Sequence, residues 1–143
     1  MKRFLSFVSL VVLVAIVAAG CEFSVSTANI KQAVLSKDVQ GDKFEPVDPT
    51  STFSTDQPML HLVVSVANAP SDTKVKAAWT AVDVGDVAPA NTKIAETEVV
   101  LNSDGNAHFT MSIPDTGVWP VGKYKVDVYL NDKLDRTLEY TVE

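Results

Sequence analysis

The chain has 143 residues, and its 12 basic and 18 acidic side chains give a formal net charge of −6. This length suits one domain. The acidic balance argues against a nucleic-acid partner, because phosphate binding needs clustered lysine and arginine. The one cysteine excludes an intramolecular disulfide.

The first 20 residues have the pattern of an export signal. Lys2 and Arg3 precede an apolar run over residues 4–17, and residues 18–20 are small, as a cleavage site requires. A membrane-spanning helix is the alternative, since the run approaches the roughly 20 residues that cross a bilayer. The small residues and the cysteine that follows them favour cleavage after Gly20.

The stretch VAAGC, residues 17–21, resembles the lipobox of bacterial lipoproteins, with Ala18 where that family most often has leucine. The resemblance implies that Cys21 is acylated and becomes the N-terminus, so that palmitate-type chains hold the protein at a membrane. Two or more chains anchor a protein stably, whereas one does not. We therefore expect a lipid-anchored protein on the extracytoplasmic side of a cell membrane, at the cell surface or in the periplasm. Loss of the leader removes two basic residues, which makes the mature net charge −8.

The rest of the chain predicts a β-sandwich. Residues 21–28 form a short tether, and the folded domain spans residues 29–143. Period-two alternation of apolar and polar residues, broken by turn residues, recurs along this domain. It predicts strands at 29–37, 59–67, 74–82, 93–101, 107–113, 123–130 and 134–142. Seven short strands favour an all-β fold, a single antiparallel sandwich without a disulfide.

The connection over residues 39–58 holds Pro46, Pro49 and Pro58, which bar it from a central strand. Phe53 is the one residue of this connection that we expect at the edge of the core.

The stretch GKYKV, residues 122–126, is similar to the start of strand F in immunoglobulin-like domains, where a tyrosine hydrogen-bonds back to the chain. Trp79 stands where these domains bury a tryptophan, and Val64 and Val126 replace the usual cysteine pair. The domain thus resembles an immunoglobulin-like or fibronectin-III-like sandwich, and residues 119–133 resemble the C-terminal hairpin of such modules in bacterial surface lipoproteins. The resemblance implies no catalytic residue.

Catalysis and metal binding find little support in the residues. His61 and His108 are the only histidines. Placed near the starts of two antiparallel strands, they are expected at opposite ends, on the order of 10 Å apart at about 3.3 Å per residue, as solvated side chains. That separation excludes a shared zinc. Glu96 and Glu98 share one strand face, as an acid/base pair or as a solvated acidic edge. We expect neither an enzyme nor a cofactor.

Two features are candidates for binding. The first is a lysine stripe on the outer face of two strands, at Lys74, Lys76, Lys123, Lys125, Asp127 and Tyr129. Lys76 is expected near Asp127. The stripe suits an anionic envelope polymer or an acidic protein, and a merely solvated sheet face is the alternative. The second is Trp119, either as a loop contact residue or as a cap on the end of the sandwich.

These observations predict a membrane-anchored, non-catalytic binding or structural module. Its partner is a protein or an envelope polymer of unspecified identity. The alternative is a lipid-tethered inhibitor of an extracytoplasmic hydrolase. An inhibitor is expected to present residues 69–73 or 115–120 as ordered loops that protrude from one end of the sandwich.

Overall fold

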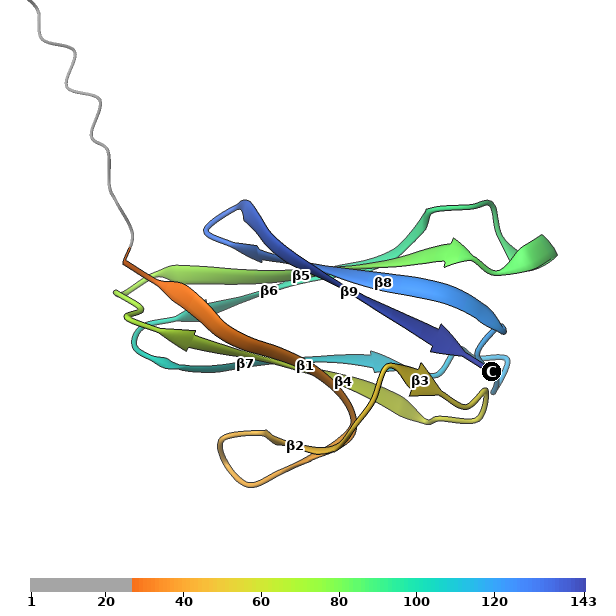
Figure 1. Cartoon of the computed structure of the whole chain (residues 1–143), viewed down its shortest axis with the longest axis horizontal. Coiled ribbons are helices and arrows are strands. Elements are labelled where there is room, and N and C mark those ends of the chain that lie inside the picture. The colour runs from red at the N-terminus through yellow and green to blue at the C-terminus, as the bar shows by residue number, and fades with distance from the viewer. Residues whose placement is uncertain (1–26) are drawn as a thin grey trace, which may run out of the picture.

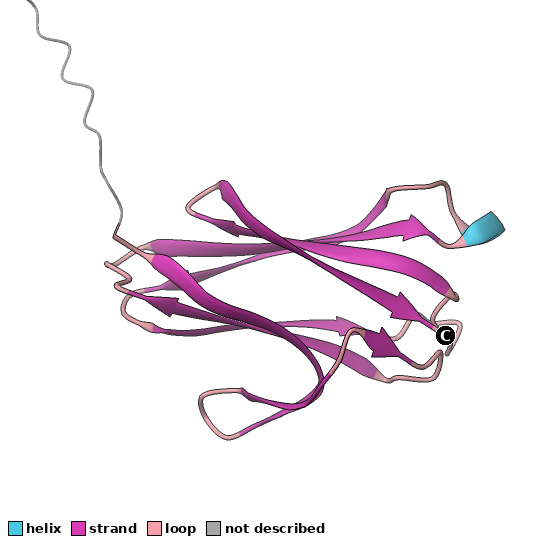
Figure 2. Cartoon of the chain, in the orientation of Figure 1, coloured by secondary structure: helices cyan, strands magenta, loops and turns pink. Residues whose placement is uncertain are grey.

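The computed structural model describes residues 27–143, so the leader and Cys21 lie outside the described residues. These residues form two packed sheets (Figures 1 and 2). The elements are β1 (Asn29–Gln40), β2 (Glu45–Pro49), β3 (Thr52–Phe53), β4 (Met59–Ala67), β5 (Thr73–Asp83), the 3-10 turn η1 (Gly85–Val87), β6 (Thr92–Leu101), β7 (Gly105–Ser112), β8 (Gly122–Leu130) and β9 (Lys133–Val142).

One sheet has the strand order β2-β1-β4-β7 and the other the order β3-β9-β8-β5-β6. All pairings are antiparallel except that of β3 with β9. The predicted all-β antiparallel sandwich is confirmed, and each of the seven predicted strands is present.

Residues 39–58 are not a strand-free connection, because they contribute the two further strands β2 and β3. Both are edge strands, so the prediction that the prolines bar this segment from a central strand is confirmed. Pro46 and Pro49 lie in β2, which is an edge strand where the missing amide hydrogens are tolerated. Phe53 is buried in the core, as expected.

The core follows from the alternation along the strands. In β4, β5 and β8 every second side chain points between the sheets. Val64, Trp79 and Val126 are all buried there, so valine packing occupies the place that a disulfide takes in related folds. Burial of each large apolar side chain contributes about 1.5–3 kcal/mol, which is why this row fixes the register.

The start of β8 has the expected tyrosine corner. The hydroxyl of Tyr124 donates a hydrogen bond of 2.6 Å to the carbonyl oxygen of Pro120. Gly122 is needed two residues earlier, since a Cβ there would lie 2.2 Å from the carbonyl oxygen of Asp83. The sequence motif is therefore explained by one hydrogen bond and one close backbone approach.

The β1–β2 hairpin adds a feature that the strand pattern did not predict. β1 runs beyond its pairing with β4, and the hairpin folds against the outward face of the four-stranded sheet (Figure 1). The ring of Phe44 stacks on that of His108 with centroids 4.5 Å apart, and Asn106 Nδ2 donates to the carbonyl of Lys43 at 2.6 Å. Side chains on this face are thereby shielded from water.

The sandwich has two distinct ends. The N-terminal end holds Thr27, whose hydroxyl donates to the carbonyl of Asn68 at 3.1 Å, and the turns β4–β5, β6–β7 and β8–β9. The loop end holds the loops over residues 84–91 and 113–121 and the C-terminus (Figure 1). The chain therefore enters the domain at the end opposite to its longer loops.

Candidate functional site

The lysine stripe lies on the outer face of β5 and β8, but its register differs from the expected one. Lys76 faces Tyr129, with its ammonium 4.5 Å from the ring centroid, and Asp127 faces Ala78. Lys76 was expected next to Asp127, but the register between β5 and β8 is shifted by two residues from the expected one. The reason is that strand pairing is set by the buried row, which sequence alternation alone does not align between strands.

Most of the positive charge in the stripe is compensated by carboxylates. Lys74 pairs with Asp132 at 3.8 Å, Lys76 with Glu96 at 3.6 Å, and Lys125 with Asp127 at 3.3 Å. Exposed pairs of this kind contribute little stability, about 0–1 kcal/mol each. Their consequence is electrostatic, because a stripe of paired charges attracts an anionic polymer weakly.

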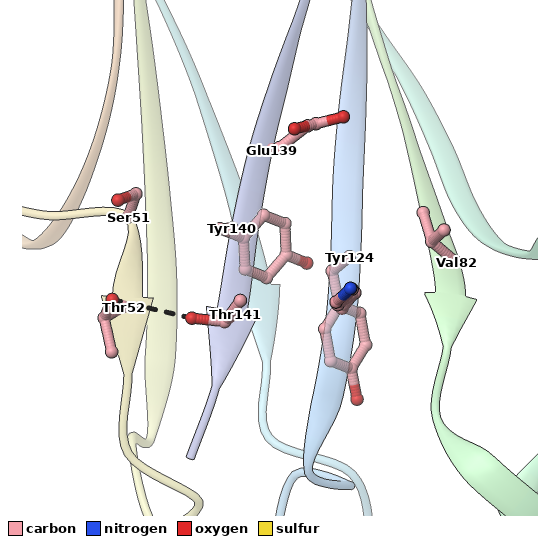
Figure 3. A pocket seen from close by; sticks show the side chains of 8 residues that line it. Ser51, Thr52, Val82, Tyr124, Glu139, Tyr140 and Thr141 are labelled. Carbon is pink, nitrogen blue, oxygen red and sulfur yellow. Dashed lines mark hydrogen bonds between the residues drawn. The ribbon is translucent and has the colours of Figure 1, made fainter.

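Among the four lysines of the stripe, Lys123 is the exception, since no carboxylate oxygen of residues 27–143 lies within ion-pair distance of its ammonium. It lines an open pocket of about 370 Å³ across β3, β9, β8 and β5 (Figure 3). The other lining residues are Ser51, Thr52, Val82, Tyr124, Glu139, Tyr140 and Thr141. Hydroxyl groups, one cation and one carboxylate therefore meet at this place on the sheet face.

Trp119 is buried, with 3% of its surface exposed, and is not available as a contact residue. Its indole Nε1 donates to the carbonyl of Gln57 at 2.7 Å, and its backbone N–H donates to the carbonyl of Thr55 at 2.8 Å. The capping alternative is the one that the structure shows. These two hydrogen bonds fix the 113–121 loop against the β3–β4 connection.

The loop end has an apolar surface, which we call the loop-end surface and define by the exposed side chains of Val87, Ile94, Val118 and Val121. Between the two loops lies a cavity of about 260 Å³. Its lining is almost entirely apolar and includes Val84, Val87, Ile94, Pro114, Trp119 and Pro120. Exposed apolar groups gathered around a cavity are typical of protein contact sites.

The two histidines are in contact, so the expected separation was wrong. His61 Nδ1 lies 3.0 Å from His108 Nε2, and the parallel rings have centroids 5.3 Å apart. The ladder pairs Val63 with His108, which puts His61 one diagonal step away on the same face. His61 is only 8% exposed, because the β1–β2 hairpin lies against this face of the sheet.

The histidine pair is held by a hydrogen bond and is not arranged as a metal site. Asp38 Oδ1 lies 4.0 Å from His61 Nε2, the ring nitrogen that does not face His108. Within the part of the chain that the structure describes, no three metal-ligating side chains converge. Burial, and then the neighbouring His61, lower the pKa of His108 below its ordinary value.

Glu96 and Glu98 share the outer face of β6, as predicted, and differ in their surroundings. The ammonium of Lys93 hydrogen-bonds to Glu96 and, with Lys76, lowers the pKa of that carboxyl group. Glu98 is exposed and makes no ion pair with any described residue. Glu96 thus has neither the burial nor the raised pKa of a general acid, and both side chains lie on an edge strand.

Comparisons with known proteins identify the fold. No family model and no curated protein sequence matches the chain. Among solved structures, an immunoglobulin-like protein from Pseudomonas aeruginosa is 12% identical with a TM-score of 0.54, and the match covers 81% of this chain and 96% of that one. The Pseudomonas fluorescens alkylpurine DNA glycosylase AlkC, bound to DNA, is 13% identical with a TM-score of 0.50. That match covers 81% of this chain but spans only 30% of the glycosylase. At such identities the likeness concerns architecture alone, and the described domain has the fold of an immunoglobulin-like β-sandwich.

Proposed function

We propose that the protein is a membrane-anchored extracytoplasmic lipoprotein whose immunoglobulin-like domain binds a protein partner non-covalently through the loop-end surface. The observation that carries this proposal is the placement of the two ends. The described chain begins at Thr27, at the N-terminal end, and four of the seven exposed large apolar side chains of the described residues, those of the loop-end surface, lie at the opposite end. Val100 and Leu134 are exposed beside the turns of the N-terminal end, and neither of them lines the loop-end cavity. A lipid on Cys21 would thus direct the loop-end surface away from the bilayer.

The tether sets how far the domain extends from the membrane. Residues 21–28 reach at most about 28 Å when fully extended, at about 3.5 Å per residue. Acylation with two or three chains would hold the domain at the membrane and raise its local concentration there. Within residues 27–143 no helix is long and apolar enough to cross a bilayer.

The chemistry of the loop-end surface suits an apolar anchor from a partner. Val87 and Val121 are 69% and 62% exposed, and the adjacent cavity of about 260 Å³ has room for a large apolar side chain. Interfaces draw much of their affinity from such an anchor in a desolvated pocket. Trp119 contributes indirectly, because its two hydrogen bonds hold one wall of the cavity in place.

The test is photo-crosslinking of the tethered protein on intact source cells. A photo-reactive residue is placed at Val118 or Val87 and, as a matched control, at the exposed Asp72 of the N-terminal end. Cys21→Ala provides the anchor control, and incorporation of an alkyne palmitate analogue reports acylation directly. We expect one recurrent protein at Val118 and Val87, no such product at Asp72, and loss of both label and product in Cys21→Ala.

Three results would count against this proposal. Equal crosslinking of the partner from Asp72 and from Val118 or Val87 would show that the loop-end surface is not the binding surface. Absence of the palmitate label would remove the anchor. Crosslinks to envelope polymer alone would indicate that the protein binds a polymer, with the sheet face around Lys123 as the binding surface to test.

Inhibition of an extracytoplasmic hydrolase is a second candidate, favoured by the hydrogen bonds that hold the 113–121 loop in place. Residues 69–73 and 115–120 lie at opposite ends, so an anchored protein would present only the latter away from the membrane. Gly117 N donates to the carbonyl of Pro114 at 2.8 Å, which tightens that loop. If the crosslinked partner is a hydrolase, we expect the protein to lower its activity and Val118→Asp to relieve the inhibition.

A further inference from the structure

The strand β6 forms one edge of the five-stranded sheet along its whole length. It has 10 residues and pairs with β5 on one side, and no described strand pairs with its other side. The opposite edge of this sheet is β3, which has two residues. Every second backbone N–H and C=O group of β6 is therefore directed away from the sheet, as a template for another strand.

The side chains of β6 that point between the sheets are incompletely covered. Ala95, Val99 and Leu101 pack against the core but remain partly exposed. The edge strand of the other sheet, β7, contacts β6 only sparsely. A further strand beside β6 would bury this apolar row if its own inward side chains were apolar.

The outward side chains of β6 set the charge of the strand that fits. Glu96 and Glu98 stand on this face, and Glu98 has no ion-pair partner among the described residues. Opposite charges on directly opposed residues stabilise a strand pair, and like charges destabilise it. The net charge of −6 also favours the approach of a cationic segment.

A second copy of the chain fits this edge poorly. A twofold antiparallel pairing of two β6 strands centred on Glu96 or Thr97, the two registers that pair the most residues, sets a glutamate against a glutamate. Registers further from the centre pair fewer residues. The carboxylates thus act against self-association and leave the edge available to a basic strand.

We propose that β6 binds an extended segment of a protein partner as an added antiparallel strand, in which apolar residues alternate with lysine or arginine. The backbone groups of β6 supply affinity, Ala95 and Val99 select apolar side chains, and Glu98 selects the basic ones. The residues that carry the inference, 95–101 of β6, lie beyond Ile94, the one β6 residue of the loop-end surface, and apart from the lipid anchor, so failure of the inference leaves the proposed function untouched.

The probe is the acetylated and amidated peptide TKVKVTVKT, with TEVEVTVET as its charge-reversed control. Hydrogen–deuterium exchange of the full-length chain, extracted in mild detergent, is measured with each peptide. We expect TKVKVTVKT to slow exchange within residues 92–101 and to leave residues 105–112 of β7 unchanged. We expect TEVEVTVET to have no effect on either segment.

Glu98→Lys should weaken binding of TKVKVTVKT roughly tenfold, because attraction becomes repulsion at an opposed position. Glu45→Lys, an equal charge change at an exposed residue of the other sheet, should leave binding unchanged. Equal protection by both peptides, or no protection of residues 92–101 by either, would overturn the proposal. So would protection of these residues that rises with protein concentration without peptide, which would identify a second copy as the occupant.

Discussion

The rings of Tyr124 and Tyr140 lie side by side on neighbouring strands, 5.2 Å apart between centroids and within 13° of parallel, yet only Tyr124 is hydrogen-bonded through its hydroxyl. The hydroxyl of Tyr140 is buried and has no hydrogen-bond partner among the described residues. Burial, and then the neighbouring Tyr124, raise the pKa of Tyr140. One tyrosine of this stack thus contributes a hydrogen bond, and the other carries an unsatisfied polar atom.

Tyr140→Phe should leave the free energy of unfolding unchanged or raise it by about 1 kcal/mol, since it removes an unpaired buried hydroxyl. Tyr124→Phe should lower it by about 1–2 kcal/mol, because the corner hydrogen bond is lost and the carbonyl of Pro120 is left without its donor. Urea denaturation of both variants measures the difference. A Tyr140→Phe variant that is as destabilised as Tyr124→Phe would mean that the Tyr140 hydroxyl has a partner.

Gly122→Ala should destabilise the fold by about 3 kcal/mol, as overpacking against rigid backbone does. The added Cβ would lie 2.2 Å from the carbonyl oxygen of Asp83 and 3.0 Å from the Cα of Val84. Gly105→Ala is the matched control, because nothing lies within 4 Å of the Cβ position there. Its effect should stay within about 0.5 kcal/mol. Thermal or urea denaturation of the two variants measures this difference. Similar losses of stability in both would contradict the close approach of Gly122 to the backbone of Asp83.

Stability should fall as the pH is lowered from 7.5 to 5, in part because of His108. Its pKa in the fold lies below the ordinary value of 6.5, so the unfolded chain takes up the proton more readily. The contribution of His108 to the free energy of unfolding is therefore fully present above pH 6.5. It is lost as the pH falls through the lowered pKa of the folded state. Urea denaturation across this range measures the slope.

His108→Phe keeps an aromatic ring beside Phe44 but does not titrate, so its stability should depend less on pH than that of the native chain. The pKa of Glu96 is lowered from 4.5, so its titration lies below the range used and does not interfere. An unchanged pH slope in His108→Phe would contradict the role assigned to His108.

Trp119→Phe should lower the free energy of unfolding by about 1–3 kcal/mol, because the part-buried carbonyl of Gln57 loses the indole donor at 2.7 Å. The same variant should weaken partner crosslinking at Val118, since one wall of the loop-end cavity is no longer fixed. Undiminished crosslinking together with the loss of stability would separate Trp119 from binding and leave it a purely structural role.

Much of the fold could be predicted from the sequence. Because every second residue of a strand is buried, apolar residues recur with a period of two. The rows through Val64, Trp79 and Val126 were read correctly, and the Gly-x-Tyr motif marked the corner at Tyr124. Two prolines hid β2, since proline excludes a central strand but is tolerated at an edge. The loop-end cavity was missed, because its lining comes from two loops and from strand ends that are far apart in the sequence. The only sequence signal of the surface around it was a valine on either side of Trp119-Pro120.

The amino-acid sequence by itself determined the sandwich class, the core rows and the expectation of a lipid at Cys21, because each depends on neighbours along the chain. Only the tertiary structure decided the contact of His61 with His108, the ion pairs that compensate the lysine stripe and the burial of Trp119. These depend on the register between strands and on which loop lies over which face. Both are set by packing between segments that lie far apart in the sequence, where local patterns carry no information.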